Sequence, residues 1–263
     1  MKKNKQKNLC IIQARYGSTR LPGKVLKKVD GLTLLEYEII RVKQAKKIDK
    51  IVIATTKNKS DKKIEELCQR IKIDCFCGSE NDVLDRYYQC SLEYPEYKNV
   101  IRITGDCPLI DPVIIDKVIS FFTKRKLDYT SNIELDTFPD GMDVEIFKKD
   151  ILIETAKRAK LPSEREHVTY YIRKNKKYKK GNLTACNNWS HFRLTVDEPI
   201  DFEVIKFLIK NSKITDGYLD YISLLTKNPK VMLSNINIIR NEWKLKALKE
   251  DGEFKKQYAK KIH

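Results

Sequence analysis

Residues 9–26 read LCIIQARYGSTRLPGKVL, and this stretch decides the fold. It opens with an apolar run of the kind that forms a strand buried on both faces of a parallel sheet. A turn-rich loop follows directly and carries the positive charges of Arg15, Arg20 and Lys24. In an open α/β sheet, ligands bind beyond the carboxyl ends of the strands, so a basic loop at this place predicts a binding site for a chain of phosphates.

The loop differs from the two common phosphate-binding motifs. It is neither a Walker A sequence nor a G-x-G-x-x-G fingerprint, which disfavours the usual nucleoside triphosphatases and dinucleotide-binding enzymes. Gly17 and Gly23 would let the backbone approach a phosphate chain closely. Basic loop residues are also found simply solvated, but their position after a buried strand favours the phosphate site.

The composition bounds the class of protein. With 263 residues, 41% of them apolar, the chain is long enough for one large α/β domain with a full core. The net charge of +17 suggests nucleic-acid binding, but the lysines are spread over the termini and the run at residues 174–180. No recognition-helix motif, zinc-finger spacing or aromatic array accompanies them, so a lysine-rich proteome is the better explanation. We expect no nucleic-acid partner.

Cysteine usage and hydropathy indicate the compartment. The seven cysteines are scattered, and several fall in apolar runs, as buried free thiols do. Cys75 and Cys77 would form half of a zinc site, but no second pair follows. No run approaches the ~18 apolar residues of a membrane span, and the first apolar segment is too short for a signal peptide. We therefore expect a cytoplasmic protein with reduced thiols and no membrane partner.

Strand and helix patterns alternate along the first half of the chain. The apolar spacing predicts strands at residues 50–55, 74–77 and 99–104. Helices are expected at residues 34–42, 60–70 with Ser60 as N-cap, 82–93, and from Pro112 onward. This alternation predicts an α/β fold with a mostly parallel central sheet flanked by helices on both faces.

The pattern changes after Lys126. Residues 129–132 predict a strand, and the Pro-Asp-Gly turn with alternating apolar residues at 138–147 indicates an inserted antiparallel hairpin. Ser163 and Glu166 have the spacing of a capping box, residues 193–196 predict a short strand, and Pro199 opens a helix. No linker or repeat divides the chain. We expect a single domain over residues 1–263, with a nucleotide-binding part at about 8–132 and a helical C-terminal tail at about 235–263.

Two aspartates are expected at the carboxyl ends of strands. Asp106 follows the strand at 99–104, and Asp197 follows the predicted strand at 193–196. Two carboxylates at one edge of a sheet, opposite a basic loop, are what a hard divalent cation and a polyphosphate require. The sequence therefore predicts a Mg²⁺ site at Asp106 and Asp197. Each aspartate alone is also typical of a turn or a helix cap.

The chain resembles the cytidylyltransferases that activate acidic sugars, the group of 3-deoxy-manno-octulosonate and acylneuraminate cytidylyltransferases. Its strongest resemblance is to their spore-coat polysaccharide biosynthesis branch. The motifs that carry it are IQARYGSTRLPGKVL, GSENDVLDRY, TGDCPLIDP, FPDGMDVEIF, SEREHVTYYI, TVDEPIDFEV and RNEWKLKALKED, so it spans nearly the whole chain. In that family the first aspartates of the Gly-Asp-x-Pro-Leu and Val-Asp-x-Pro-x-Asp motifs bind magnesium, and they match Asp106 and Asp197. Cys107 stands where the octulosonate enzymes usually have Glu, so the identity of the sugar does not carry over.

The resemblance implies a Rossmann-like nucleotide-diphospho-sugar transferase fold. It also implies a homodimer formed through the hairpin, with the sugar-binding and dimerisation part at about 133–200. The implied reaction is attack by a hydroxyl of an acidic sugar on the α-phosphorus of CTP, with Mg²⁺ as cofactor and pyrophosphate as product. Such an enzyme would serve the biosynthesis of a surface polysaccharide or glycan.

The implied site residues fall into groups. The catalytic group is Arg15, Arg20, Lys24, Asp106 and Asp197, of which Asp106 and Asp197 would bind the metal. The nucleotide-binding group is Ala14, Arg15, Gly17, Ser18, Arg20, Lys24, Ser79, Asp82, Arg86 and Asp106. The candidates for the sugar are Asp140, Asp143, Glu145, Arg165, His167 and Arg193, among which Arg165 or Arg193 would offer a guanidinium fork to a carboxylate. Some also have plain structural roles: Ser79 or Asp82 as a helix cap, Arg86 in a surface ion pair, and His167 on a helix surface.

Two other classes of function stay open. A glycosyltransferase that uses a nucleotide sugar shares this type of fold, but its metal usually lies on an Asp-x-Asp pair, which Asp106-Cys107-Pro108 does not provide. A nucleic-acid-binding protein is favoured only by the net charge. Pyrophosphate release from each nucleotide in the presence of acidic sugars would separate the three classes.

Overall fold

The computed structural model describes residues 6–241 and 243–260. Lys2, Lys3 and Lys5 of the basic N-terminus lie outside the described residues. So do residue 242 and residues 261–263 of the predicted tail.

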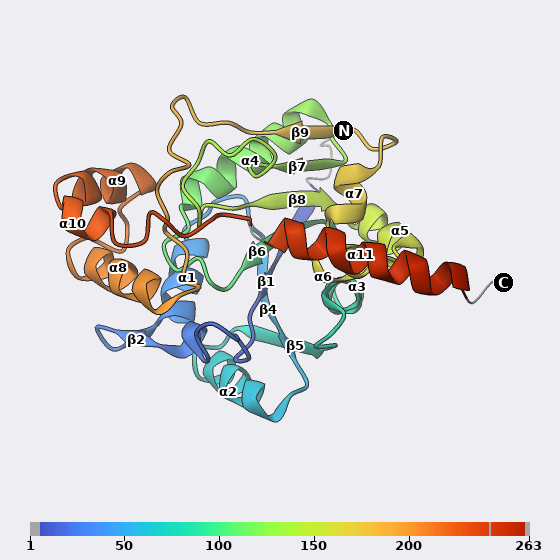
Figure 1. Cartoon of the computed structure of the whole chain (residues 1–263), viewed down its shortest axis with the longest axis horizontal. Coiled ribbons are helices and arrows are strands. Elements are labelled where there is room, and N and C mark those ends of the chain that lie inside the picture. The colour runs from blue at the N-terminus through green and yellow to red at the C-terminus, as the bar shows by residue number, and fades with distance from the viewer. Residues whose placement is uncertain (1–5, 242, 261–263) are drawn as a thin grey trace.

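The described residues form a seven-stranded sheet at the centre of the molecule (Figure 1). Its order is β5-β4-β1-β6-β8-β7-β9. β8 runs antiparallel to both of its neighbours, and the other pairs are parallel. The predicted mostly parallel sheet is thereby confirmed. The strands are β1 (Lys7–Gln13), β4 (Lys50–Thr56), β5 (Asp74–Gly78), β6 (Tyr97–Thr104), β7 (Tyr129–Ser131), β8 (Glu145–Lys148) and β9 (Lys180–Asn182).

Helices cover both faces of this sheet because the side chains of its central strands alternate in direction and are apolar on both faces. In β1, Cys10 and Ile12 point to one hydrophobic core, and Leu9 and Ile11 point to the other. The first core is covered by α1 (Leu34–Val42), α2 (Lys62–Arg70), α4 (Pro112–Arg125), α8 (Pro199–Lys210) and α9 (Tyr218–Thr226). The second core is covered by α3 (Val83–Leu92), α5 (Lys149–Arg158) and α7 (Tyr170–Lys174).

The remaining elements are short or peripheral. They are the 3₁₀ helices η1 (Lys24–Leu26) and η2 (Lys59–Asp61), the small hairpin of β2 (Lys28–Val29) and β3 (Leu32–Thr33), α6 (Pro162–Glu166), α10 (Pro229–Met232) and α11 (Trp243–Lys260). The C-terminal helix α11 lies against α6, where the Ser163 hydroxyl donates a 2.7 Å hydrogen bond to Asp251 (Figure 1). The predicted helical tail is therefore confirmed from Trp243 to Lys260, whereas residues 235–241 form turns and no helix.

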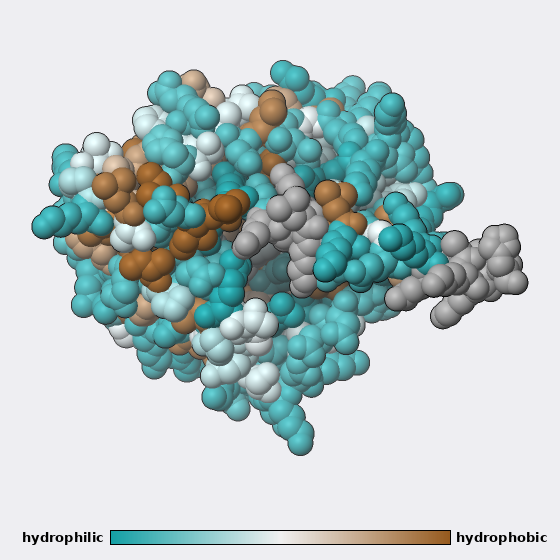
Figure 2. Space-filling model, viewed as in Figure 1, coloured by the Kyte–Doolittle hydropathy of each residue, from teal (hydrophilic) through white to brown (hydrophobic). Residues whose placement is uncertain are grey.

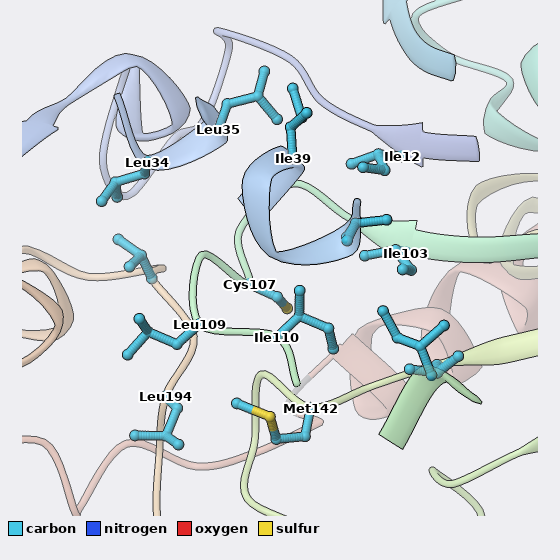
Figure 3. Packing of buried hydrophobic residues seen from close by; sticks show 14 of the residues in the cluster. Ile12, Leu34, Leu35, Ile39, Ile103, Cys107, Leu109, Ile110, Met142 and Leu194 are labelled. Atoms are coloured by element: carbon cyan, nitrogen blue, oxygen red, sulfur yellow. The ribbon is translucent and has the colours of Figure 1, made fainter. Parts of the chain in front are cut away.

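The predicted antiparallel hairpin is confirmed, but its loop is long. β7 and β8 pair antiparallel and are joined by residues 132–144, and β8 inserts between β6 and β7. Beneath the end of β6, Cys107 packs into the first core with Ile103, Ile110 and Met142 (Figure 3). Cys107 as a whole is only 3% exposed, so this residue belongs to the packed floor beside Asp106.

Three local predictions are wrong. Ser60 does not cap α2, because it lies inside η2 and the helix begins at Lys62. Ser163 forms no capping box with Glu166, because it lies inside α6 and its hydroxyl binds Asp251; Glu164 accepts the Leu161 N–H instead, at 3.1 Å. Residues 193–196 form no strand, only a single bridge between Arg193 and Asp140. The Val196 N–H donates a hydrogen bond to the Asp106 carbonyl. Because Asp106 lies beyond the end of β6, this bond adds no strand to the sheet.

The surface and the thiols add two observations. All seven cysteines are free, and only Cys186 is exposed, as expected for reduced thiols. Figure 2 shows a largely hydrophilic face whose apolar residues gather over the region where Figure 1 places α8, α9 and α10. Leu219 of α9 and Leu233, which follows α10, are exposed. None of the helices that the structure describes has a stretch long and apolar enough to span a bilayer.

Candidate active site

Two adjoining cavities lie beyond the carboxyl ends of β1 and β6. The wider cavity has a volume of about 740 Å³, and the narrower one a volume of about 510 Å³. The residues that line both are Arg15, Arg20, Arg102, Asp106, Glu166, His167 and Asp197. The cavities are therefore two ends of one polar cleft, at the place where parallel sheets bind ligands.

The basic loop after β1 is folded tightly against the sheet. Tyr16, near the start of the loop, donates its backbone N–H to the buried carboxylate of Asp61 at 2.7 Å, which anchors the loop to the end of β4. Gly23 has a φ of 68°, and a Cβ there would lie 2.8 Å from the Tyr16 ring. Only glycine fits this left-handed, crowded position, which starts η1 and turns Lys24 inward.

Lys24 joins the two predicted metal ligands. Its Nζ lies 3.0 Å from Asp106 Oδ2 and 2.8 Å from Asp197 Oδ1. Burial by itself would raise the pKa of Asp106, but the Lys24 ammonium and hydrogen bonds outweigh burial and lower that pKa to about 2. Burial would lower the pKa of Lys24, and the two carboxylates raise it above its usual value. Lys24 and Asp106 are thus held in the charged form, since each charged state stabilises the other.

Asp106 and Asp197 fit the requirements of a magnesium ion. Their carboxylate oxygens converge on one cationic atom, and carboxylate oxygen is the ligand that hard cations prefer. No group of three or more His, Cys, Asp or Glu side chains suited to a metal occurs among the described residues. A Mg²⁺ ion held here would therefore complete its coordination with water and phosphate oxygens, as this ion usually does.

Asp197 is positioned by two arginines. Arg20 lies 3.0 Å from it and 3.4 Å from Glu198, and the Arg20 side chain is 45% exposed to the cleft. Arg193 is almost buried and makes ion pairs with three aspartates: Asp140 at 2.7 Å, Asp197 at 2.9 Å and Asp201 at 2.9 Å. Because each of its three guanidinium nitrogens already binds an aspartate, Arg193 positions carboxylates.

A glycine makes this network possible. Gly141 has a φ of 95°, and a Cβ there would lie 2.6 Å from the backbone of Leu194. The backbones of the two segments therefore touch: Asp140 donates its N–H to the Phe192 carbonyl, and its own carbonyl accepts the Leu194 N–H. This close approach places Asp140 beside Arg193.

The C-terminal segment contributes another arginine to the wall of the wider cavity. Arg240 lies 2.7 Å from Asp143 and within 3.7 Å of Asp136 and Asp140, and it donates to the Phe138 carbonyl at 3.0 Å. Burial raises the pKa of Asp143 to about 7, although the Arg240 charge opposes the shift. The tail is thereby attached to the acidic rim of the cleft.

Arg102 and Glu145 form a buried pair at the floor. Glu145 accepts hydrogen bonds from Arg102 at 2.5 Å, Tyr129 at 2.6 Å and Thr169 at 2.5 Å. Burial would raise the Glu145 pKa, but Arg102 and the other donors lower it. His167 lies nearby, and burial together with the charges of Arg102 and Arg173 lowers its pKa to about 4.

The narrower cavity is lined by the predicted nucleotide residues Ala14, Arg15, Arg20, Arg86 and Asp106. Arg86 is 2% exposed and donates to the Ser79 carbonyl at 3.0 Å, and burial lowers its pKa. Ser79 and Asp82 form the cap of α3: the Ser79 hydroxyl accepts the Asp82 N–H, and Asp82 accepts the Asp85 N–H at 2.8 Å.

The structure brings ten of the predicted residues to the cleft and leaves seven out of its lining. The residues in the lining are Ala14, Arg15, Arg20, Arg86, Asp106, Asp140, Asp143, His167, Arg193 and Asp197. Gly17, Ser18, Lys24, Ser79, Asp82, Glu145 and Arg165 are not in the lining. Lys24 and Glu145 contact lining residues from behind, whereas Arg165 binds Asp82 at 2.8 Å and the Ala156 carbonyl.

Sequence reasoning missed Arg102, Arg173, Arg240 and Asp201. For Arg102 a signal was present, because residues 102, 104 and 106 share one side of a strand with period two. Arg102, Thr104 and Asp106 all line the wider cavity. Asp201 also had a signal, because it is the last aspartate of the Val-Asp-x-Pro-x-Asp motif. Arg173 and Arg240 gave none, since their partners lie in distant segments.

Comparisons with known proteins identify what this chain resembles. A sequence family described as cytidylyltransferase matches residues 9–238. The chain is 36% identical over 231 residues to the spore coat polysaccharide biosynthesis protein SpsF of Bacillus subtilis, covering 84% of this chain and 95% of that protein. It is 29% identical over 178 residues to the 8-amino-3,8-dideoxy-manno-octulosonate cytidylyltransferase of Shewanella oneidensis, covering 63% and 70%. A solved cytidylyltransferase from Leptospira borgpetersenii superimposes with a TM-score of 0.84 at 34% identity, covering 89% of this chain and 100% of that one.

Proposed function

Since this chain belongs to the cytidylyltransferase family, we propose that it transfers CMP from CTP to a hydroxyl of an acidic sugar and releases pyrophosphate. The product would serve the biosynthesis of a surface polysaccharide or glycan. The observation that carries the proposal is the convergence of Asp106 and Asp197 on Lys24 at the carboxyl end of the sheet, with Arg15 and Arg20 in the same cleft.

Phosphoryl and nucleotidyl transfer need positioning and neutralisation of charge more than covalent participation of the protein. Asp106 and Asp197 would hold Mg²⁺, which when bound neutralises phosphate charge and orients the triphosphate. Arg20 is half-exposed and paired only at the edge of the cleft, so its guanidinium can turn to the phosphates. Arg15 lines both cavities and has no ion-pair partner among the described residues. Both arginines are suited to stabilise the charge that grows on departing pyrophosphate.

The narrower cavity would take the nucleotide and the wider one the sugar. The Shewanella relative is described as acting on an octulosonate, a sugar that carries a carboxylate. In this chain the wider cavity contains several arginines, which supports an anionic sugar. We also propose a homodimer and a cytoplasmic location, on the resemblance to the family; sedimentation of the purified chain tests the first.

The decisive experiment measures pyrophosphate release with each nucleoside triphosphate, Mg²⁺ and a panel of sugar acids. We expect release with CTP and a sugar acid, loss of release with EDTA, and a CMP-sugar as the product by mass spectrometry. CTP should also raise the melting temperature more than ATP or GTP at equal concentration. Equal release from all nucleotides would refute the base assignment. Sugar transfer from a nucleotide sugar, without use of CTP, would indicate the glycosyltransferase alternative.

A further inference from the structure

We propose that Arg102 binds the carboxylate of the sugar and so determines that the substrate is an acid; this inference rests on the proposed function. The residue projects from β6, the central strand that ends at the candidate metal ligand Asp106. Nothing in its local sequence is typical of a binding motif. The inference comes from the position and the hydrogen bonding of its guanidinium group.

The first step is the location of Arg102 in the cleft. Arg102 lines both cavities, together with Asp106, so it lies where the nucleotide and sugar ends of the cleft meet. In an octulosonate the carboxylate is attached to the anomeric carbon, which also carries the reacting hydroxyl. A group that binds this carboxylate must therefore lie close to the metal ligands rather than at the far end of the wider cavity.

The second step is the state of the other arginines in the wider cavity. Arg193 and Arg240 each interact with three aspartates. Arg20 is paired with Asp197 and Glu198 and belongs to the phosphate loop. Arg165, a predicted carboxylate fork, binds Asp82 and lines neither cavity. A new carboxylate would have to displace existing partners from each of these residues.

Arg102 differs from the three of these arginines that line the cleft because it has only one carboxylate partner among the described residues; Arg15 has none there, but it belongs to the phosphate loop. The partner of Arg102 is Glu145, bound through Nη1, whereas Nε and Nη2 donate no hydrogen bond there. Glu145 also accepts from Tyr129 and Thr169, so its negative charge is shared among three donors. The guanidinium of Arg102 therefore keeps donor capacity and positive charge that Glu145 does not fully satisfy.

The surroundings of Arg102 are positive as well. Arg173 lines the same cavity, and its ion pair is with Glu134 at the surface. The charges of Arg102 and Arg173 both act on His167 and oppose its protonation. An anion placed between these side chains would relieve this repulsion, and the Glu145 pair fixes the orientation of Arg102 before the sugar arrives.

A plain alternative is that Arg102 only neutralises Glu145 and holds β6 against β8. The two roles are separated by a pair of substrates: a sugar acid and its methyl ester, which has the same shape but no charge. 8-Amino-3,8-dideoxy-manno-octulosonate and an acylneuraminate, each with its ester, are suitable probes. If Arg102 recognises the carboxylate, its loss lowers kcat/KM for the acid only. If its role is structural, its loss lowers kcat/KM for both substrates equally.

The variants are Arg102→Met, Arg102→Lys and the double variant Arg102→Met/Glu145→Gln. The double variant removes the buried glutamate charge that Arg102→Met would leave uncompensated, so it guards against simple misfolding. Arg70→Met is the matched control, because Arg70 also pairs with one buried glutamate, Glu36, at 3.0 Å and lines neither cavity.

We expect kcat/KM for the acid to fall about a hundredfold in Arg102→Met and in the double variant, since a buried charge pair loses one partner. The ester should change less than threefold, Arg102→Lys should be intermediate, and Arg70→Met should match the wild type. Stabilisation by CTP should stay the same in all variants. Equal losses for acid and ester, or no loss for either, would overturn the assignment of Arg102.

A binding measurement separates this inference from the proposed function. Without CTP, the sugar acid should raise the melting temperature of the wild type but not that of Arg102→Met. If the wild type binds the acid through Arg102 and yet releases no pyrophosphate with any nucleotide, the reaction is wrong and the carboxylate site stands. If pyrophosphate is released but the variants bind the acid as the wild type does, the reaction stands and the site is wrong. If the wild type neither binds nor uses any sugar acid, both are overturned.

Discussion

The Nζ atom of Lys24 lies 2.8 Å from Oδ1 of Asp197, although 173 positions separate the two residues in the chain. The same atom lies 3.0 Å from Asp106. Three distant segments thus meet at one ammonium group beyond the end of the sheet. When no metal is bound, the Lys24 ammonium compensates the charges of two carboxylates that would otherwise repel each other. A divalent cation would compete with this ammonium for the same carboxylate oxygens.

The aspartates at this point are expected to be essential. Asp106→Asn and Asp197→Asn keep the size of each side chain and remove the charge that a hard cation requires. We expect pyrophosphate release to fall at least about a hundredfold in both, since metal coordination contributes several kcal/mol to such reactions. Circular dichroism should show a folded protein. Asp150→Asn, at an exposed position in α5, is the control. Near-normal activity of either variant at low Mg²⁺ would mean that its carboxylate is no ligand.

The Lys24 ammonium should stabilise the metal-free protein and lower the affinity of the protein for Mg²⁺. Lys24→Met leaves Asp106 and Asp197 without their shared ammonium, which should destabilise the metal-free protein by about 2 kcal/mol. Mg²⁺ alone should then raise the melting temperature of the variant more than that of the wild type, because no ammonium competes with it. Lys28→Met, at an exposed position of β2, should respond like the wild type. Equal Mg²⁺ effects on Lys24→Met and wild type would argue against a shared position.

The strands and most helices could be predicted because their signals are local. The apolar runs of β1, β4 and β6 are buried, as their own composition indicates. Asp111 caps α4 and Pro112 is its first residue, as expected. Ser60 and Ser163 were misassigned because capping depends on the exact path into a helix. Both serines lie inside helical turns.

The site was predictable only in part. Asp106 and the basic loop follow strands directly, so their positions follow from the sheet. Asp197 lies at the same point at the end of a loop and is held there by Arg193, whose three aspartate partners come from two distant segments, one with Asp140 and one with Asp197 and Asp201. This arrangement depends on the backbone contact at Gly141, and the attachment of Arg240 spans about a hundred residues. Neither contact leaves a pattern in the local sequence.

Glu38 should make stability depend on pH. It is fully buried in α1, and burial together with the charge of Asp106 raises its pKa well above the usual value. A raised pKa in the folded state means that the contribution of this group is present below its unfolded pKa and is lost as pH rises. We expect Glu38→Met to be more stable than the wild type at pH 8, by about 1–2 kcal/mol, because a buried ionisable group is replaced by an apolar one of similar size.

Urea unfolding at pH 5 and pH 8 measures this difference. The advantage of Glu38→Met should be smaller at pH 5, where the wild-type carboxyl keeps its proton at less cost. Glu66→Gln, which changes an exposed glutamate of α2, serves as the control for removal of a glutamate charge. The same advantage at both pH values would show that Glu38 does not titrate on unfolding.

His167 should make the protein sensitive to acid. Burial and the charges of Arg102 and Arg173 lower its pKa to about 4, while Glu145 and Asp251 act in the opposite direction. As pH falls below about 6.5, the unfolded chain binds a proton at this histidine and the folded protein does not. Stability is therefore lost between pH 6.5 and 4, and with these two pKa values the loss amounts to ~2 kcal/mol at pH 5.

The comparison of His167→Gln with the wild type isolates this contribution. Glutamine has no proton to gain, so the variant should lose about 2 kcal/mol less than the wild type between pH 7.5 and pH 5 in urea unfolding. His191→Gln, at an exposed position, should lose as much as the wild type. The neutral state of His167 in the folded protein also predicts that turnover shows no inflection near pH 6.5 from this group. An acid loss in His167→Gln equal to that of the wild type would place the proton uptake on other residues, and would mean that the positive charges of Arg102 and Arg173 are already compensated in the folded protein.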